Sequence, residues 1–155
     1  MRVIGIDLGM RWIGIALSDE TGTIATPLAV AEGVEKALCL LRKIIADDGG
    51  ERIVLGLPRN MDGTLGPKAK EALRFADLLR DRLGVPVEVW DERLTTVEAE
   101  RYLREADVPP RRWKERVNQV AAQILLQSFL DARGLADHPD GPDSSGEDEA
   151  PGPEA

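Results

Sequence analysis

The clearest chemical feature of the chain is an acidic residue that closes an apolar strand. Residues 3–6 read Val-Ile-Gly-Ile, Asp7 follows them, and Gly9 lies two places further on. A buried carboxylate costs on the order of several kcal/mol unless a positive group meets it. A divalent metal ion is the natural partner for such an acid, and this predicts a chain that handles phosphates.

Two more polar segments follow apolar strands. Residues 58–63 (Pro-Arg-Asn-Met-Asp-Gly) come after the apolar run 53–57, and Asp91-Glu92-Arg93 comes after the alternating valines of 85–89. Ligands gather beyond the carboxyl ends of parallel strands, so we expect both segments to share one sheet edge with Asp7. Asp7 and Glu92 are then candidates to hold Mg²⁺ or Mn²⁺. The alternative is that each acid only ends a strand or caps a turn.

Composition excludes several other chemistries. The one histidine, His138, lies in an acidic tail, which rules out a serine–histidine triad or a histidine general base in the folded part. The one cysteine, Cys39, allows neither an internal disulfide nor a cysteine-cluster zinc site, as expected in a reducing cytosol. We read no export signal and no run of the roughly 18 apolar residues that a membrane helix needs. A cytoplasmic protein is expected.

The formal net charge of −8 is unevenly distributed along the 155 residues. Residues 137–155 carry seven acidic side chains and no Lys or Arg, which leaves 20 basic and 21 acidic residues in the rest of the chain. The body is therefore almost neutral, and its charge does not exclude a nucleic-acid partner.

Hydrophobic periodicity predicts the element order βββαβαβαα. The first three strands form an antiparallel meander over about residues 3–30, and Pro27 places the third strand at a sheet edge. Helices then alternate with two further strands, 53–57 and 85–89. The first two helices end at Gly49 and Gly84. A third helix spans about 95–106, and the last spans about 112–133 and is closed by Gly134. The fold class is α/β, with a mixed five-stranded sheet flanked by helices. Residues 1–134 form one domain, and residues 135–155 form an acidic, disordered tail.

Three motifs in order resemble those of the YqgF/RuvX family. They are Ile6-Asp7-Leu8-Gly9 with Ile13-Gly14, Gly56-Leu57-Pro58 with Asn60-Met61-Asp62-Gly63, and Asp91-Glu92-Arg93-Leu94-Thr95-Thr96 with Glu98-Ala99. The resemblance covers about residues 1–134 and implies a ribonuclease H-like fold with strand order 3-2-1-4-5. It also implies a metal-dependent nuclease that is Holliday-junction-resolvase-like, active in DNA recombination and repair, or that processes the 5′ end of precursor 16S ribosomal RNA in ribosome biogenesis.

The family's acidic set falls on Asp7, on Glu92 and on an aspartate early in the last helix, where this chain has Asn118. An amide oxygen can ligate magnesium but brings no negative charge, so a second metal should bind more weakly. Asn118 shares a helical stripe with Ala122, Leu125 and Phe129, which predicts that it faces the sheet. Glu115, about one turn earlier, is a candidate to supply the missing charge. The alternative is an inactive site in which Asn118 is only a hydrogen-bonded polar residue.

Basic residues near these carboxylates are candidates to bind substrate phosphates. The predicted substrate-binding set is Arg11, Arg59, Asn60, Arg93 and Lys114. Further basic side chains surround Trp113 before the last helix, where a tryptophan can stack on an unpaired base or pack against apolar surface: Arg101, Arg104, Arg111, Arg112 and Arg116.

Three functions remain open from the sequence. The leading hypothesis is a metal-dependent phosphodiesterase that cleaves structured nucleic acid, with Asp7, Glu92 and Asn118 at its centre. The second is a catalytically weak or inactive nucleic-acid-binding module, motivated by Asn118. The third is an actin-like ATPase, which a chain of this length disfavours because such proteins close two domains over the nucleotide. Branched DNA and precursor ribosomal RNA are not distinguished, and paired incision of a junction would require a homodimer.

Overall fold

The computed structural model describes residues 1–58, 62–91, 100–101 and 103–137 of the chain. Five strands form one sheet in the order β3-β2-β1-β4-β5, as the family resemblance implies. The strands are β1 (Arg2–Leu8), β2 (Trp12–Ser18), β3 (Ala25–Glu32), β4 (Gly50–Leu57) and β5 (Val87–Asp91). β1, β2 and β3 pair antiparallel, whereas β4 pairs parallel with both β1 and β5. Pro27 lies in the edge strand β3, and the pairing of β2 with β3 shifts register beside it, between Ile15 and Ala16.

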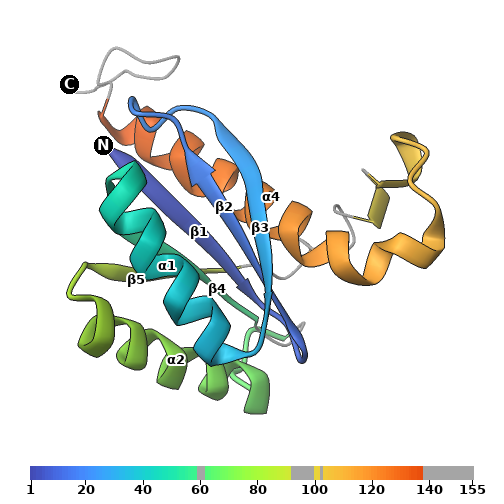
Figure 1. Ribbon diagram of the computed structural model, residues 1–155, viewed down its shortest axis with the longest axis horizontal. Coiled ribbons are helices and arrows are strands. Elements are labelled where there is room, and N and C mark those ends of the chain that lie inside the picture. Colours follow the sequence, from blue (N-terminus) through green and yellow to red (C-terminus); the bar gives the residue numbers. More distant parts are fainter. Residues whose placement is uncertain (59–61, 92–99, 102, 138–155) are drawn as a thin grey trace.

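Two helices cover one face of the sheet (Figure 1). They are α1 (Val34–Asp48) and α2 (Pro67–Leu83). Each ends at a glycine in the left-handed conformation, Gly49 at φ 77° and Gly84 at φ 68°, as the sequence predicts. Along α2, Phe75 is buried in the core, whereas Leu73 is 36% exposed, so the apolar face of this helix lies slightly off the stripe inferred from leucine and alanine spacing.

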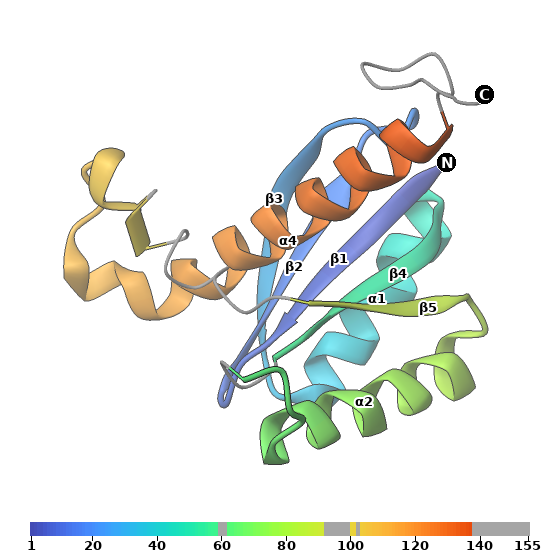
Figure 2. The ribbon, with the colours of Figure 1, turned by 180° about the vertical axis from the view of Figure 1, so that it is seen from behind.

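The third layer is the long helix α4 (Trp113–Asp137), which crosses the opposite face (Figure 2). A short 3₁₀ turn, η1 (Pro110–Arg112), precedes it. The prediction that Gly134 closes the helix is wrong, because α4 continues for three residues beyond it. Gly134 keeps helical geometry here, and a glycine ends a helix only where it adopts a left-handed cap. Residues 100–101 and 103–105 are helical, within the predicted helix 95–106.

Glycines in the two central strands allow α4 to approach the sheet closely. A Cβ on Gly5 would lie 2.7 Å from the Leu126 Cβ, and a Cβ on Gly14 would lie 2.0 Å from the Asn118 carbonyl oxygen. Only residues without a side chain fit at these points. Below the helix a small core joins the sheet to α4: Val3, Ala16, Ala25, Val54, Ala122, Leu126, Phe129 and Leu130. The height of α4 above β1 and β2 is therefore fixed by backbone contact.

No helix in the described part of the chain is long and apolar enough to cross a membrane. Of the predicted disordered tail, residues 135–137 belong to helix α4. Residues 138–155 lie outside the description, and their disorder stays a prediction.

Candidate active site

Asp7 lies at the carboxyl end of β1 and is 6% exposed. Strand alternation places Ile4 and Ile6 in the core against α1 and α2, and it directs Gly5 and Asp7 toward α4. Asp7 pairs with Gly14 of β2, so the residue next to the carboxylate on the neighbouring strand has no side chain. The sequence correctly predicts a buried acid at a strand end.

Asn118 of α4 contacts the Asp7 carboxylate from the helix that packs on this face of the sheet. Its Nδ2 donates a hydrogen bond to Asp7 Oδ2 at 2.7 Å, across 111 positions of sequence. An ionised carboxylate only accepts hydrogen bonds, so the amide must present its NH₂ group to Asp7 and direct Oδ1 elsewhere. The prediction that the Asn118 stripe faces the sheet is confirmed.

The space around Asn118 is narrow. A Cβ on Gly9 would lie 2.4 Å from Asn118 Nδ2, and Gly14 contacts the backbone of Asn118 itself. Gly9 and Gly14, which the sequence shows only as parts of a motif, thus form the cradle that seats the amide against Asp7.

The carboxyl ends of β1, β4 and β5 meet at one edge of the sheet. Leu55 of β4 pairs with Ile6, and Leu57, the last residue of β4, pairs with Asp91, the last residue of β5. Glu92 and Arg93 follow Asp91 directly in sequence, and Arg59 and Asn60 closely follow Leu57; all four lie outside the described residues. In the loop after β4, hydrogen bonds from the Thr64 hydroxyl and backbone N–H lower the pKa of the Asp62 carboxyl.

The chemistry of the donors at Asp7 suits a hard divalent cation. Carboxylate and amide oxygens are the ligands that Mg²⁺ and Mn²⁺ prefer. Within the described residues no group of three His, Cys, Asp or Glu side chains could hold a metal ion. Glu115 belongs to α4, one turn before Asn118, but its side chain, like that of Lys114, lies outside the description.

Arg11 occupies the turn between β1 and β2, close to Asp7 in sequence. Its Nε donates to Glu32 Oε2 at 2.6 Å, and its guanidinium lies over the Trp12 ring, 5.3 Å from the centroid. This contact lowers the pKa of the Glu32 carboxyl. The Arg11 side chain is 71% exposed and open to a ligand, although Glu32 offsets its charge.

Comparisons with known proteins agree with this arrangement. The profile of a family described as "RuvX: Holliday junction resolvase" matches residues 1–132. A protein of Myxococcus xanthus is 46% identical over 149 residues, covering 93% of this chain and 99% of its own length. One of Desulforudis audaxviator is 47% identical over 135 residues, covering 86% and 96%. Both bear the name "Putative pre-16S rRNA nuclease". The chain belongs to the RuvX family.

Solved structures support the fold. RuvC of T. thermophilus, in complex with a Holliday junction substrate, superposes with a TM-score of 0.50 at 18% identity, covering 86% of this chain and 96% of that chain. The fowlpox virus resolvase with Holliday junction DNA gives 0.50 at 10% identity, covering 86% and 99%. The fold of this RuvX-family chain is therefore that of these resolvases. Its membership of a family whose relatives are named nucleases makes the chain a nuclease, a phosphodiester hydrolase.

Trp113, which the sequence left as either a base-stacking or a packing residue, has packing contacts in this RuvX-family chain. Its Nε1 donates to the Val108 carbonyl at 2.8 Å, and its ring packs against the cluster of Leu103, Val120 and Ala121. The Arg104 guanidinium covers the ring at 5.4 Å from its centroid. Trp113 thus anchors the start of α4.

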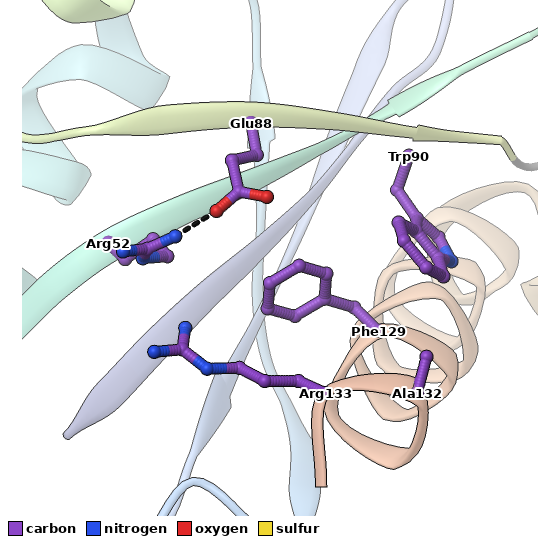
Figure 3. A pocket seen from close by; sticks show the side chains of 6 residues that line it. All are labelled: Arg52, Glu88, Trp90, Phe129, Ala132 and Arg133. Carbon is purple, nitrogen blue, oxygen red and sulfur yellow. Dashed lines mark hydrogen bonds and ion pairs between the residues drawn. The ribbon is translucent and has the colours of Figure 1, made fainter. Parts of the chain in front are cut away.

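An open pocket of about 290 Å³, which no sequence pattern predicts, lies between β4, β5 and the end of α4 (Figure 3). Trp90 and Phe129 meet edge to face in its wall, and Arg52 forms an ion pair with Glu88 beside them. Arg133, in the same wall, follows Asn118 by 15 residues along α4, or about 22 Å of helix. The cavity is therefore separate from the Asp7 site.

Proposed function

We propose that this chain is a Mg²⁺- or Mn²⁺-dependent nuclease whose metal is held by Asp7 and Glu92 and whose substrate is structured nucleic acid. Precursor 16S ribosomal RNA is the first candidate substrate, because the most similar relatives described above carry that activity in their names. Four-way DNA junctions are the second, from the description of the family. The observation that carries the proposal is the buried Asp7 carboxylate at the edge where three parallel strand ends meet.

The surroundings of Asp7 leave room for a cation. Among the described residues, the carboxylate accepts one hydrogen bond, from Asn118, and forms no ion pair. An ionised carboxylate offers about four lone-pair sites. A carboxylate that is 6% exposed gains much from a bound cation, since burial has already removed most of its hydration.

When bound, Mg²⁺ or Mn²⁺ supplies Lewis-acid activation of the phosphodiester and of a water molecule. The chain's own residues divide the remaining work. Asp7 and Glu92 hold the cation, and Asn118 fixes the rotamer of Asp7 through its hydrogen bond. Glu115 is the candidate for a further carboxylate on α4. Asn118, through its Oδ1, is also a candidate ligand.

Substrate contacts are proposed for side chains that surround this edge: Arg11, Arg59, Asn60, Arg93 and Lys114. Each cation that neutralises a phosphate adds affinity that falls with salt. Work on a ribosomal precursor places the protein in the cytoplasm, and paired incision of a DNA junction would require a homodimer. The noncatalytic binding module has no support from the relatives, which are named as nucleases.

The first experiment replaces the carboxylate. We expect Asp7→Asn to abolish metal-dependent cleavage of a precursor 16S RNA fragment and of a four-way junction, with Asp47→Asn, an exposed residue of α1, as the matched control. Both proteins are assayed with Mg²⁺, with Mn²⁺ and with EDTA. Cleavage by the wild type without a divalent ion, or equal cleavage by the Asp7 variant, would refute the proposal. The ratio of rates on the two substrates identifies the preferred one.

The second experiment tests the metal through stability. Asn118→Asp places a second carboxylate against Asp7 at hydrogen-bond distance, and like charges this close oppose each other. Without metal we expect a loss of about 1–3 kcal/mol in the free energy of unfolding, because a buried hydrogen bond also disappears. Mg²⁺ should restore this loss, giving the variant a larger metal-dependent rise in Tm than the wild type. An identical metal response in both proteins would show that position 118 does not face the cation.

A further inference from the structure

The turn between β1 and β2 displays an apolar side chain in water. Met10 is 94% exposed, the largest value among the exposed large hydrophobic residues of the described part, where the next is Ile24 at 59%. Its neighbours in the turn are Arg11 and Gly9, and the turn lies at one end of the sheet (Figures 1 and 2). At this exposure the Met10 side chain adds little to the packing of the described part of the chain, and it is available for contact with a ligand.

The turn itself is firmly held. Gly9 N–H donates to the Trp12 carbonyl at 3.0 Å, and Gly33 N–H donates to the Arg11 carbonyl at 3.3 Å. The ion pair of Arg11 with Glu32 and the stacking of Arg11 on Trp12 hold the two side chains that follow Met10. Met10 is thus presented outward by a constrained backbone, which lowers the entropy cost of using it in a complex.

Met10 is close to the proposed site of cleavage. Met10 lies three positions after Asp7, and a fully extended chain over three positions spans at most about 11 Å. Successive bases along one strand rise about 3.4 Å, so this reach corresponds to about three nucleotides. A phosphate at Asp7 therefore brings neighbouring bases within contact of Met10.

We propose that Met10 is a wedge that contacts the faces of nucleobases beside the scissile phosphate and unstacks them. This inference rests on the proposed nuclease function and adds a determinant of substrate shape. Proteins that distort nucleic acid insert apolar side chains between base steps, and the flexible, polarisable thioether of methionine adapts to any base. Arg11 beside it would contact the adjoining phosphate. Together they would favour unpaired or branched substrates, whose bases open at little cost.

The test compares Met10→Ala and Met10→Leu with the parent, all in the Asp7→Asn background to prevent cleavage. Ile24→Ala is the matched control, because Ile24 is also an exposed apolar residue. It follows the turn between β2 and β3, at the end of β2 opposite to Met10. Precursor 16S RNA fragments and four-way junctions carry 2-aminopurine at each of three nucleotides on both sides of the cut. Binding is followed by anisotropy, and base unstacking is followed by 2-aminopurine fluorescence.

We expect the parent and Met10→Leu to raise the fluorescence of at least one position. Met10→Ala should lose this signal and bind about five- to tenfold more weakly, toward the lower end of what stacking a base on a side chain provides. Ile24→Ala should behave as the parent, and urea midpoints should be equal throughout.

Unchanged fluorescence and affinity in Met10→Ala would overturn the wedge, as would an equal loss in Ile24→Ala. Failure of the nuclease proposal looks different. If Asp7→Asn still cleaves, the proposed function falls whatever the fluorescence shows. If Asp7→Asn is inactive while Met10→Ala matches the parent, only the wedge is refuted.

Discussion

Adding one methyl group at Gly14 should damage both the fold and the site. The Cβ of Gly14→Ala would lie 2.0 Å from the Asn118 carbonyl oxygen and 2.2 Å from its carbon, whereas real Cβ contacts essentially never fall under 3.0 Å. Helix α4 must therefore withdraw by about 1 Å at Asn118, an overpacking that costs about 1–3 kcal/mol. The same shift lengthens the Asn118–Asp7 contact from 2.7 Å to about 3.7 Å, beyond hydrogen-bond range.

Two measurements separate these effects. Urea unfolding gives the loss of stability, and kcat/KM for metal-dependent cleavage, measured where the variant is fully folded, should fall by about 10²-fold, the cost of a 1 Å misplacement in an active site. Gly134→Ala is the control in the same helix, because a Cβ there meets nothing within 4 Å. It should raise stability by about 0.5–1 kcal/mol and leave kcat/KM unchanged. A Gly14→Ala protein with wild-type stability and activity would refute the claim that backbone contact sets the position of Asn118.

Two further predictions concern charged groups of the β-meander. Glu32→Gln should release Arg11 from its ion pair and tighten nucleic-acid binding. The slope of log K against log salt should steepen by about 0.9, as measured by anisotropy titrations over several salt concentrations, whereas the control Glu35→Gln should leave it unchanged. An unchanged slope in Glu32→Gln would show that Arg11 makes no phosphate contact. Hydrogen bonds from the Thr21 hydroxyl and from two backbone N–H groups lower the pKa of Asp19 from 3.8 to about 2. Because the folded pKa is the lower one, the stabilisation is complete above pH 3.8 and is lost as the pH falls toward 2. The stability difference between wild type and Asp19→Asn should therefore be constant from pH 7 to pH 4 and shrink below it in urea titrations, and a difference independent of pH down to 2 would contradict this assignment.

Much of the fold could be predicted because local signals agree with the tertiary structure. The apolar run of residues 3–6, closed by Asp7, correctly predicted β1, and Pro27 correctly marked an edge strand. The prediction that a glycine ends the helix was right at Gly49 and Gly84, where the backbone is left-handed. It was wrong at Gly134, where the backbone stays helical. The residue type is the same in all three cases. What differs is whether the chain must turn there, and tertiary context decides that.

The site divides in a similar way. Helical periodicity was enough to predict that Asn118 faces the sheet. The position of Asp7 at the end of an apolar strand was enough to predict its burial. The pairing of these two residues required knowing where α4 crosses the sheet, which depends on contacts among residues more than 100 positions apart. The exposure of Met10 had no sequence signal either, because a methionine before an arginine and a tryptophan reads equally well as part of a strand.

The close packing of α4 explains why an amide can occupy a position where related chains are expected to carry an acid. Gly9 and Gly14 allow the helix to lie against the strands, and the side chain of residue 118 contacts Asp7. Two carboxylates at this distance repel each other, and a cation between them would offset that repulsion. An amide donates a hydrogen bond instead, so the fold keeps its geometry whether or not a cation is bound. Asn118 therefore brings less negative charge to the site than an aspartate would, and in the proposed mechanism a second metal ion would depend more on the substrate phosphate.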